Sequence, residues 1–384
     1  MSDPYLPSEI CDYIVDLLHN EPDTLERCCL VSRSWVPRTR KHLFADIRFL
    51  YTKHLRRWKW TFPDPSRSPA HHTHTLTICC SEAVTAADAQ EGGWIRTFSN
   101  VTRLKMSGDF ERPKASLIPF HNFSPALKYL HVASATFPCA QIFDFICSFR
   151  LLEDLDLVQR RVIIAGPIDR DGAIFQPSTS PALTGILRVY LSESMEYATR
   201  RLLNLPGGLH FRKLELSCYF EGNIQWIRAL VAGCSDTLEC VDIKYWISLP
   251  SGQVNPPMVS VDLSKATKLK EVVFRSKTPH VIWLALAFQS ITSKHICLHR
   301  ISIHVPEIPD LAIHGWTTSE MIHRQWTVLD RVLIQLWESH GIRPKVMYSV
   351  TEEKKEIQRE RIGGLLPETT GRGVIEPENF AEFC

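Results

Sequence analysis

Apolar residues near the start of the chain recur at the spacing of one face of an α-helix. These positions are Ile10, Ile14, Leu17 and Leu18. Pro7, just ahead of them, suits the first turn of a helix because its φ is fixed and its missing N–H is not needed there. The pattern therefore predicts a helix that begins directly after Pro7.

Two further short helices are expected within the first fifty residues. One spans residues 24–32 with Asp23 as its N-cap, and the other spans residues 35–44 with Ser34 as its N-cap. Three short helices form a unit too small to bury much apolar surface. We therefore assign residues 1–50 to a small helical domain that leans on another surface.

The apolar side chains of this segment outnumber those that three short helices can bury. They are Leu6, Ile10, Ile14, Leu17, Leu18, Leu25, Leu30, Val31 and Trp35. Full burial of one large apolar side chain contributes roughly 1.5–3 kcal/mol, so leaving several in water is costly. A groove on a partner protein would cover them. The alternative is that the helices pack on the C-terminal part of the same chain.

From about residue 73 to residue 305 the apolar pattern changes to a period of two. Short runs with two apolar positions separated by one residue recur at intervals of about 25 to 34 residues. The runs are 76–78, 104–106, 130–132, 155–157, 189–191, 214–216, 241–243, 272–274 and 301–303. Such runs predict strands, and apolar stretches between some of them predict helices. No unit could bury its own apolar face, so the units are expected to stack into a solenoid.

The segments around this array complete the predicted organisation. Residues 51–72 contain several prolines and are expected to form a semi-rigid linker. An amphipathic helix over residues 317–336 and a strand over residues 345–350 would cap the end of the array. The array with its cap covers residues 73–350. Residues 351–384 are densely charged, then rich in Gly, Pro and Glu, and are expected to be partly disordered.

The N-terminal segment resembles an F-box, the motif that docks on the Skp-type adaptor of cullin–RING ubiquitin ligases. The resemblance rests on the run Leu6-Pro7-x-Glu9-Ile10 and on Cys29-Leu30-Val31-Ser32-Arg33-x-Trp35. The continuation Arg40-x-x-Leu43-Phe44 is similar to an extended form common in fungal F-box proteins. This resemblance implies that the adaptor contacts, or their immediate support, are Leu6, Pro7, Ile10, Ile14, Leu18, Leu30, Val31 and Trp35.

The repeated array resembles the leucine-rich repeat, because several runs extend to L-x-x-L-x-L. The asparagine that usually marks such repeats is missing from most units, which indicates an irregular array. The expected fold is α+β overall: a small three-helix F-box followed by an α/β leucine-rich-repeat-like solenoid with a parallel sheet.

Together the two resemblances imply a substrate-recognition subunit of a Skp–cullin–F-box ligase that is not itself an enzyme. Its partners would be a Skp-type adaptor, a cullin reached through it, and an unidentified protein target. The candidate target-binding positions point away from the solenoid core. They are Lys105, His131, Asp156, Tyr190, Glu215, Asp242, Lys244, Arg275 and His304. Their mixed charges favour neither an acidic nor a basic target. Aromatic residues after two strands could form a contact rim or pack in the core, namely Tyr219, Phe220, Tyr245 and Trp246.

The net charge and the length of the apolar runs indicate whether nucleic acid or a membrane is a partner. The 44 Lys and Arg residues against 42 Asp and Glu residues leave a net charge of +2, so no overall field favours nucleic acid or an anionic membrane. Residues 33–59 are locally basic, with Trp58 and Trp60 nearby; a solvated helix face and aromatic anchoring on the repeats are expected there rather than a nucleic-acid patch. The longest apolar run, residues 281–288, is far shorter than the roughly 20 residues of a membrane span. With no secretory signal in view, we expect the cytoplasm or the nucleus.

A search for catalytic or cofactor-binding motifs finds none. The sequence contains no phosphate-binding Gly-rich loop, no H-E-x-x-H and no G-x-S-x-G. The histidines at 71, 72 and 74 lie near Cys79 and Cys80, but their spacing matches no zinc site. No cofactor or metal is therefore expected, and cysteines such as Cys139, Cys147, Cys218 and Cys240 are expected to be small buried residues. Two alternatives stay open: a repeat scaffold outside any ligase, whose N-terminal helices cap the array, and a hydrolase whose site assembles only in three dimensions.

Overall fold

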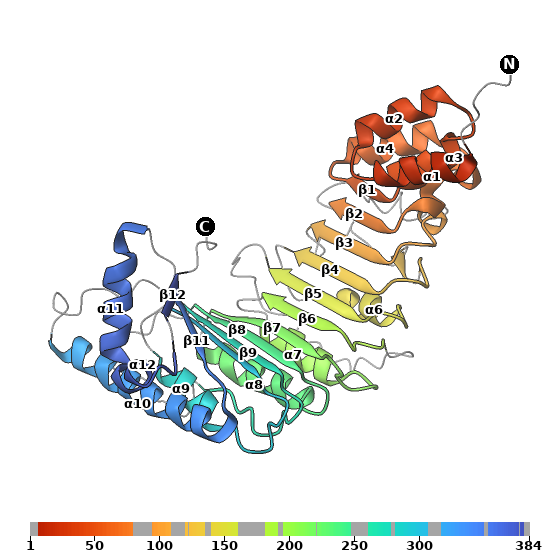
Figure 1. The fold of residues 1–384 in the computed structure, drawn as a ribbon. Helices are drawn as coiled ribbons and strands as arrows, with labels where there is room; N and C mark the ends of the chain where they lie inside the picture. The colour runs from red at the N-terminus through yellow and green to blue at the C-terminus, as the bar shows by residue number, and fades with distance from the viewer. Residues whose placement is uncertain are drawn as a thin grey trace. The chain divides into compact units, whose positions relative to one another are not determined.

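The computed structural model describes most of the chain. The described residues are 7–79, 94–108, 120–121, 123–134, 140–159, 181–190, 195–219, 221–246, 260–277, 281–305, 316–348, 352–375 and 377–379. They form two compact units: the first is Met1–Ala173 with Pro177–Ala182, and the second is Ile174–Gln176 with Leu183–Cys384. Both units are α+β, with parallel strands joined by helices and loops (Figure 1).

The first unit begins with the three predicted helices. They are α1 (Ser8–Leu17), α2 (Pro22–Val31) and α3 (Val36–Leu43). Helix α2 starts earlier than predicted, because Pro22 occupies its first turn and Asp23 lies inside the helix. Helices α2 and α3 have no side-chain cap, so the expected capping by Asp23 and Ser34 is not found.

Five neighbouring parallel strands follow in the first unit. They are β1 (Asp46–Phe49), β2 (Thr75–Cys79), β3 (Arg103–Gly108), β4 (Tyr129–Ser134) and β5 (Asp154–Gln159). Each strand pairs with the next in register, so one apolar residue per strand joins a continuous buried row. That row is Ile47, Leu76, Leu104, Leu130 and Leu155. Helix α6 (Ala140–Cys147) contributes Phe143 and Ile146 to the same core.

The segment expected to be a linker is folded. It contains α4 (Thr52–Thr61) and two short 3₁₀ helices, η1 (Pro65–Arg67) and η2 (Pro69–His72); a third, η3 (Ile95–Thr97), precedes β3. Trp58 of α4 packs edge-on against Phe49 at 5.8 Å between ring centroids and lies 5.7 Å from Phe98. These aromatic contacts attach α4 to the strands. Because β1 also falls within residues 1–50, β1, α4 and β2 form a first strand–helix repeat instead of a spacer.

The described residues of the second unit form seven neighbouring parallel strands. They are β6 (Ile186–Tyr190), β7 (Lys213–Cys218), β8 (Cys240–Tyr245), β9 (Glu271–Ser276), β10 (Arg300–Val305), β11 (Lys345–Tyr348) and β12 (Pro377–Asn379). Their buried row includes Leu187, Leu214, Val241, Val272 and Ile301. Strand β6 starts three residues earlier than the predicted run 189–191, because Leu187 is the residue in register with Leu214. Leu191 lies outside the described residues.

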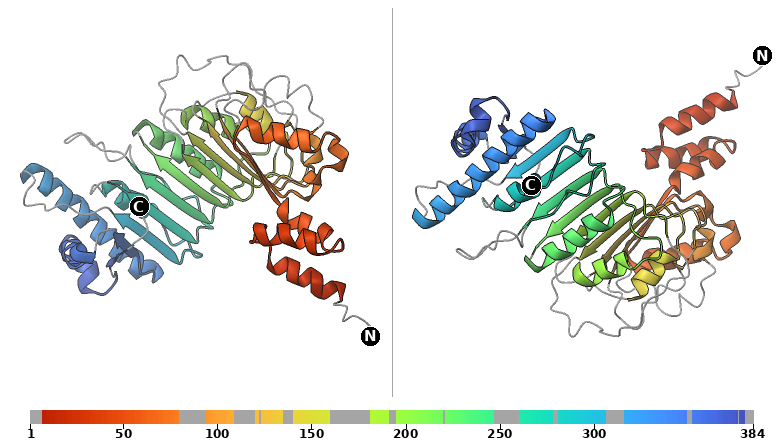
Figure 2. Two further views of the ribbon diagram at one scale, coloured as in Figure 1. Left: turned by 90° about the horizontal axis from the view of Figure 1, so that it is seen from above. Right: turned by 90° about the horizontal axis from the view of Figure 1, so that it is seen from below.

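Helices pack against one face of this second sheet (Figures 1 and 2). They are α7 (Met195–Leu203), α8 (Ile224–Gly233), preceded by η5 (Glu221–Asn223), and α9 (Ile282–Gln289). The long helix α10 (Trp316–His340) packs on α9 and ends where Gly341 adopts a positive φ of 67°. The Gly341 N–H donates to the Trp337 carbonyl at 2.7 Å, which satisfies one of the last carbonyls of the helix. The opposite sheet face carries polar side chains.

The C-terminal segment differs from the partly disordered tail expected for residues 351–384. Residues 352–375 form η7 (Glu352–Lys354), α11 (Lys355–Leu365) and α12 (Pro367–Gly371), and β12 then pairs with β11. Ile362, Leu366 and Val374 are buried. The Asp330 carboxylate of α10 accepts hydrogen bonds from the backbone N–H groups of Glu368 at 2.9 Å and Thr369 at 3.0 Å. The charged residues therefore form the outer face of a packed segment.

The cysteine prediction is confirmed at two positions. Cys147 and Cys218 are buried in the cores of their units, whereas Cys240 is only partly buried and Cys139 lies outside the described residues. Burial in apolar surroundings raises the pKa of the Cys147 thiol to about 12, so it stays protonated at neutral pH.

Candidate functional site

An apolar surface is exposed on the N-terminal helices. It comprises Ile10, Tyr13, Leu17, Leu30 and Val31, and we call it the N-terminal apolar surface. Leu30 is 87% exposed and Val31 is 69% exposed, both at the C-terminal end of α2. On α1, Ile10, Tyr13 and Leu17 recur at helical spacing and share one face. So much exposed apolar area on a small helical unit is typical of a protein-binding surface.

The interior of the helical unit is small, which explains this exposure. Its buried side chains on α1, α2 and α3 are Val15, Leu25, Cys28 and Thr39. Of the predicted adaptor contacts, Pro7, Ile10, Leu30 and Val31 are exposed, whereas Ile14, Leu18 and Trp35 are partly buried. Leu6 lies outside the described residues.

A polar contact fixes α1 on α3. The Asp16 carboxylate accepts a hydrogen bond from Arg38 Nε at 2.6 Å and a second from the same guanidinium group, and it is hydrogen-bonded to His42 Nε2 at 2.7 Å. The Arg38 hydrogen bonds, followed by that of His42, hold the pKa of Asp16 well below its usual range. The carboxylate is therefore ionised throughout the physiological pH range, and α1 is held with its apolar face outward.

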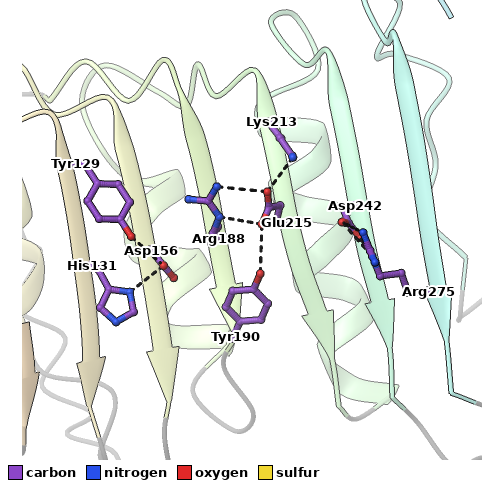
Figure 3. A network of polar contacts seen from close by, with 9 residues as sticks. All are labelled: Tyr129, His131, Asp156, Arg188, Tyr190, Lys213, Glu215, Asp242 and Arg275. Carbon is purple, nitrogen blue, oxygen red and sulfur yellow. Dashed lines mark hydrogen bonds and ion pairs between the residues drawn. The ribbon is translucent and has the colours of Figure 1, made fainter. Parts of the chain in front are cut away.

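The predicted target-binding residues of the first unit lie on one register row. Lys105, His131 and Asp156 occupy paired positions on β3, β4 and β5. The Asp156 carboxylate is hydrogen-bonded to His131 Nδ1 at 2.8 Å and accepts from Tyr129 Oη at 3.3 Å (Figure 3). Asp156 is almost fully buried, whereas Lys105 is exposed.

In the second unit, Glu215 is the centre of a charged cluster. It accepts from Arg188 Nε at 2.8 Å, Lys213 Nζ at 2.9 Å and Tyr190 Oη at 3.3 Å (Figure 3). Burial raises the pKa of Glu215, but hydrogen bonds from Lys213 and Arg188 outweigh it, so the net pKa lies below the usual value. Glu215 is therefore ionised, and the charges of Arg188 and Lys213 compensate it within the face.

Asp242 and Arg275 form a second pair on this face. Arg275 donates from Nε to Asp242 Oδ1 at 2.9 Å and from a terminal nitrogen to Oδ2 at 3.0 Å, a bidentate geometry (Figure 3). His304 is the register partner of Arg275 on β10. Burial, together with the Arg275 charge, lowers the pKa of His304 to about 4, so its imidazole is neutral at physiological pH.

Aromatic rings and lysines occupy the C-terminal ends of these strands. Tyr219 stacks on Trp246 with 6.1 Å between ring centroids, and Lys277 Nζ lies 3.5 Å from the Trp246 ring centroid. Lys244 Nζ lies 5.1 Å from the Tyr190 ring centroid. Tyr245 instead is buried and stacks on Trp283, so it belongs to the core. Phe220 lies outside the described residues.

Four residues of these clusters were not among the predicted positions: Tyr129, Arg188, Lys213 and Lys277. Each lies two residues from a predicted position on the same strand or directly beyond its end: Tyr129 before His131, Arg188 before Tyr190, Lys213 before Glu215, and Lys277 after Arg275. The period of two was therefore a sufficient signal for all four.

No set of three or more His, Cys, Asp or Glu side chains in the described ranges is placed to hold a metal ion. Every helix in the described part of the chain is too short or too polar to cross a bilayer. In the basic segment, Trp58 packs on the repeats as expected, but Trp60 is 84% exposed.

No protein-family model matches this sequence, and no curated protein matches it.

Proposed function

We propose that this chain is the target-recruiting subunit of a Skp–cullin–F-box ubiquitin ligase. The observation that carries the proposal is the N-terminal apolar surface, with Leu30 and Val31 largely exposed. These are positions at which the sequence resembles an F-box. Burial of a large apolar side chain contributes roughly 1.5–3 kcal/mol, so several such residues supply a strong driving force for docking on an adaptor groove.

The proposed mechanism is positional. The N-terminal helices dock on a Skp-type adaptor, which connects to a cullin, and the leucine-rich-repeat-like strand faces hold a protein target. Holding the target on the same assembly as the ubiquitin-loaded enzyme raises its effective concentration there. The chain performs no bond chemistry in this scheme and uses neither cofactor nor metal, and the ligase would act in the cytoplasm or the nucleus.

A repeat scaffold outside any ligase is the second candidate. The observation in its favour is that α3 packs against η2, so the helices cover the beginning of the repeats. An end cap of this kind buries its apolar residues against the repeats and presents a polar outer face. The exposure of Leu30 and Val31 on α2 favours the ligase subunit over this alternative.

The test is binding of a purified Skp-type adaptor to the full chain. We expect the double variant Leu30→Asp/Val31→Asp to bind at least about tenfold more weakly, because two carboxylates replace apolar contacts. Both residues are exposed, so the fold is retained, and circular dichroism checks this. The matched control is Glu26→Ala/Arg27→Ala, which changes exposed residues of the same helix. Absence of binding by the unmodified chain, or equal binding by the double variant, would contradict the proposal.

A further inference from the structure

The C-terminal half of the polar face in the second unit carries cations and aromatic rings but no described acid. Ser217, Lys244, Arg275 and His304 are register partners on β7 to β10. The next outward positions along the chain are Tyr219, Trp246 and Lys277. Backbone hydrogen bonds from Trp246 N–H to the Cys218 carbonyl and from Lys277 N–H to the Tyr245 carbonyl continue the strand ladder there. We call Tyr219, Lys244, Trp246 and Lys277 the cationic rim.

The acids of this face lie closer to the N-terminal ends of the strands, and each is paired. Glu215 accepts from Arg188 and Lys213, and Asp242 accepts from Arg275. Glu271 pairs with Arg300 at 3.2 Å. The negative charges of the described face are therefore compensated within the face. In the structure, the mixed charges are separated: the half of the face toward the N-terminal ends of the strands is neutral, and the half toward their C-terminal ends is positive.

The two lysines of the rim contact aromatic rings instead of carboxylates. Neither Lys244 nor Lys277 forms an ion pair with any described residue; their contacts are the rings of Tyr190 and Trp246. A cation–π contact holds an ammonium group in place, for about 0.5–1 kcal/mol at an exposed position, and leaves N–H donors for another ligand. Both charges are thus positioned and available for an anion.

We infer that the cationic rim binds an acidic segment of the protein target, with Asp or Glu carboxylates at Lys244 and Lys277 and an apolar flank against Tyr219. This inference rests on the proposed function, in which the strand face holds a target. A protein segment is favoured over nucleic acid because the rim offers only two available ammonium groups, whereas nucleic-acid sites commonly engage about 6–10 phosphates.

The test measures fluorescence anisotropy with the full chain and labelled twelve-residue peptides of constant apolar content that carry zero, three or six Glu residues. We expect affinity to rise with Glu number and to fall at least about tenfold in Lys244→Glu/Lys277→Glu, with a smaller loss in Lys244→Gln/Lys277→Gln. The matched control is Lys265→Glu/Lys268→Glu, which changes net charge equally at exposed positions of the same unit. The control variant is expected to bind like the unmodified chain.

Three results would overturn the inference: affinity independent of Glu number, an equal loss in the control variant, or tighter binding of a single-stranded oligonucleotide at the same rim. Adaptor binding, measured with the same proteins, separates this inference from the proposed function. Peptide binding lost with adaptor binding kept would refute the rim alone. Adaptor binding absent with acid-dependent peptide binding kept would refute the ligase role alone.

Discussion

At the scale of single residues, the acidic side chains on the strand face of the second unit are compensated by neighbouring cations. Asp242 is only 7% exposed, and its carboxylate keeps both oxygens hydrogen-bonded to Arg275. A buried carboxylate is tolerated because the guanidinium group compensates its lost hydration. The pair is therefore a structural part of the face as well as a source of its charge pattern.

We predict that Arg275→Leu lowers the free energy of unfolding by about 2–4 kcal/mol, because Asp242 is left as an unpaired buried charge. Denaturant unfolding monitored by circular dichroism measures this value. The double variant Arg275→Leu/Asp242→Leu is expected to recover most of the loss, since it removes both charges. A double variant less stable than Arg275→Leu would contradict the assigned pairing.

His304 predicts a pH dependence of stability. Its pKa is lowered from 6.5 to about 4 in the fold, so below pH 6.5 the unfolded chain binds a proton at this residue that the folded chain does not. Stability from this residue is complete above about pH 6.5 and is lost as the pH falls toward 4. The expected loss is roughly 1–2 kcal/mol, because the ring is partly exposed.

Comparing the unfolding free energy at pH 7 and pH 4.5 in the unmodified chain and in His304→Gln tests this dependence. The variant is expected to lose less stability on acidification. An identical pH slope in both proteins would show that His304 is not the titrating group.

The sequence predicted which residues lie on the strand face, but it could not show which charged side chains form ion pairs there and which do not. Alternation within each strand identified Glu215, Asp242 and Arg275 as outward positions. Which cation meets which acid depends on register between strands some 27 to 33 residues apart, and a single sequence contains no signal for it. The positive rim therefore became visible only in three dimensions.

At the scale of elements, the period of apolar residues predicted the strands and helices that have a regular apolar pattern of their own. Strands β2 to β11 were predicted from their apolar alternation, whereas β1, β12, α4, α7 and α11 were missed. Helix α7 buries Met195, Ala198, Thr199 and Leu202 at helical spacing, but Ala198 and Thr199 are weak apolar signals among Glu196, Arg200 and Arg201. Short, charged helices of this kind are stabilised mainly by tertiary packing, which periodicity within one helix does not reveal.

The capping of α12 by Asp330 leads to a prediction at this scale. Asp330 accepts from the Glu368 and Thr369 backbone N–H groups and from Thr369 Oγ1 at 2.6 Å, and it is buried. We expect Asp330→Ala to lower the unfolding free energy by about 2–4 kcal/mol, because buried donors lose their acceptor. Chemical denaturation measures the change.

The matched control on the same helix is Glu338→Ala. Glu338 pairs with Arg372 at 3.1 Å, with both side chains about half exposed, so its removal is expected to cost less than about 1 kcal/mol. Equal effects of the two substitutions would show that the cap does not hold α12 in place.

At the scale of the whole molecule, segments at both ends of the described chain are folded against the repeats of their own unit. In the second unit, residues 355–375 bury Ile362, Leu365, Leu366, Val374 and Ile375. The high charge of residues 351–384 had indicated a disordered tail. Composition is an average over the whole segment, so it does not reveal a few apolar side chains on one helix face. Those few side chains decide whether the segment packs.

We therefore predict that a chain ending at residue 350 is less stable than the full chain. Loss of these buried side chains exposes their contacts on α10 and β11, and the midpoint of thermal unfolding is expected to fall by more than about 5 °C. Differential scanning calorimetry of the two proteins measures the shift. Unchanged unfolding would identify residues 351–384 as an independent extension.

The brevity of β12 affects how copies of this protein behave when crowded. A parallel sheet that stops at a long, regular strand presents unpaired amides and carbonyls, which another polypeptide can use as a template for aggregation. Strand β12 has only three residues, and Pro377 has no amide hydrogen to offer. Strand β12, the last one in the described residues, thus offers little backbone for another strand to pair with, and concentrated solutions are expected to stay free of cross-β assemblies seeded from this edge.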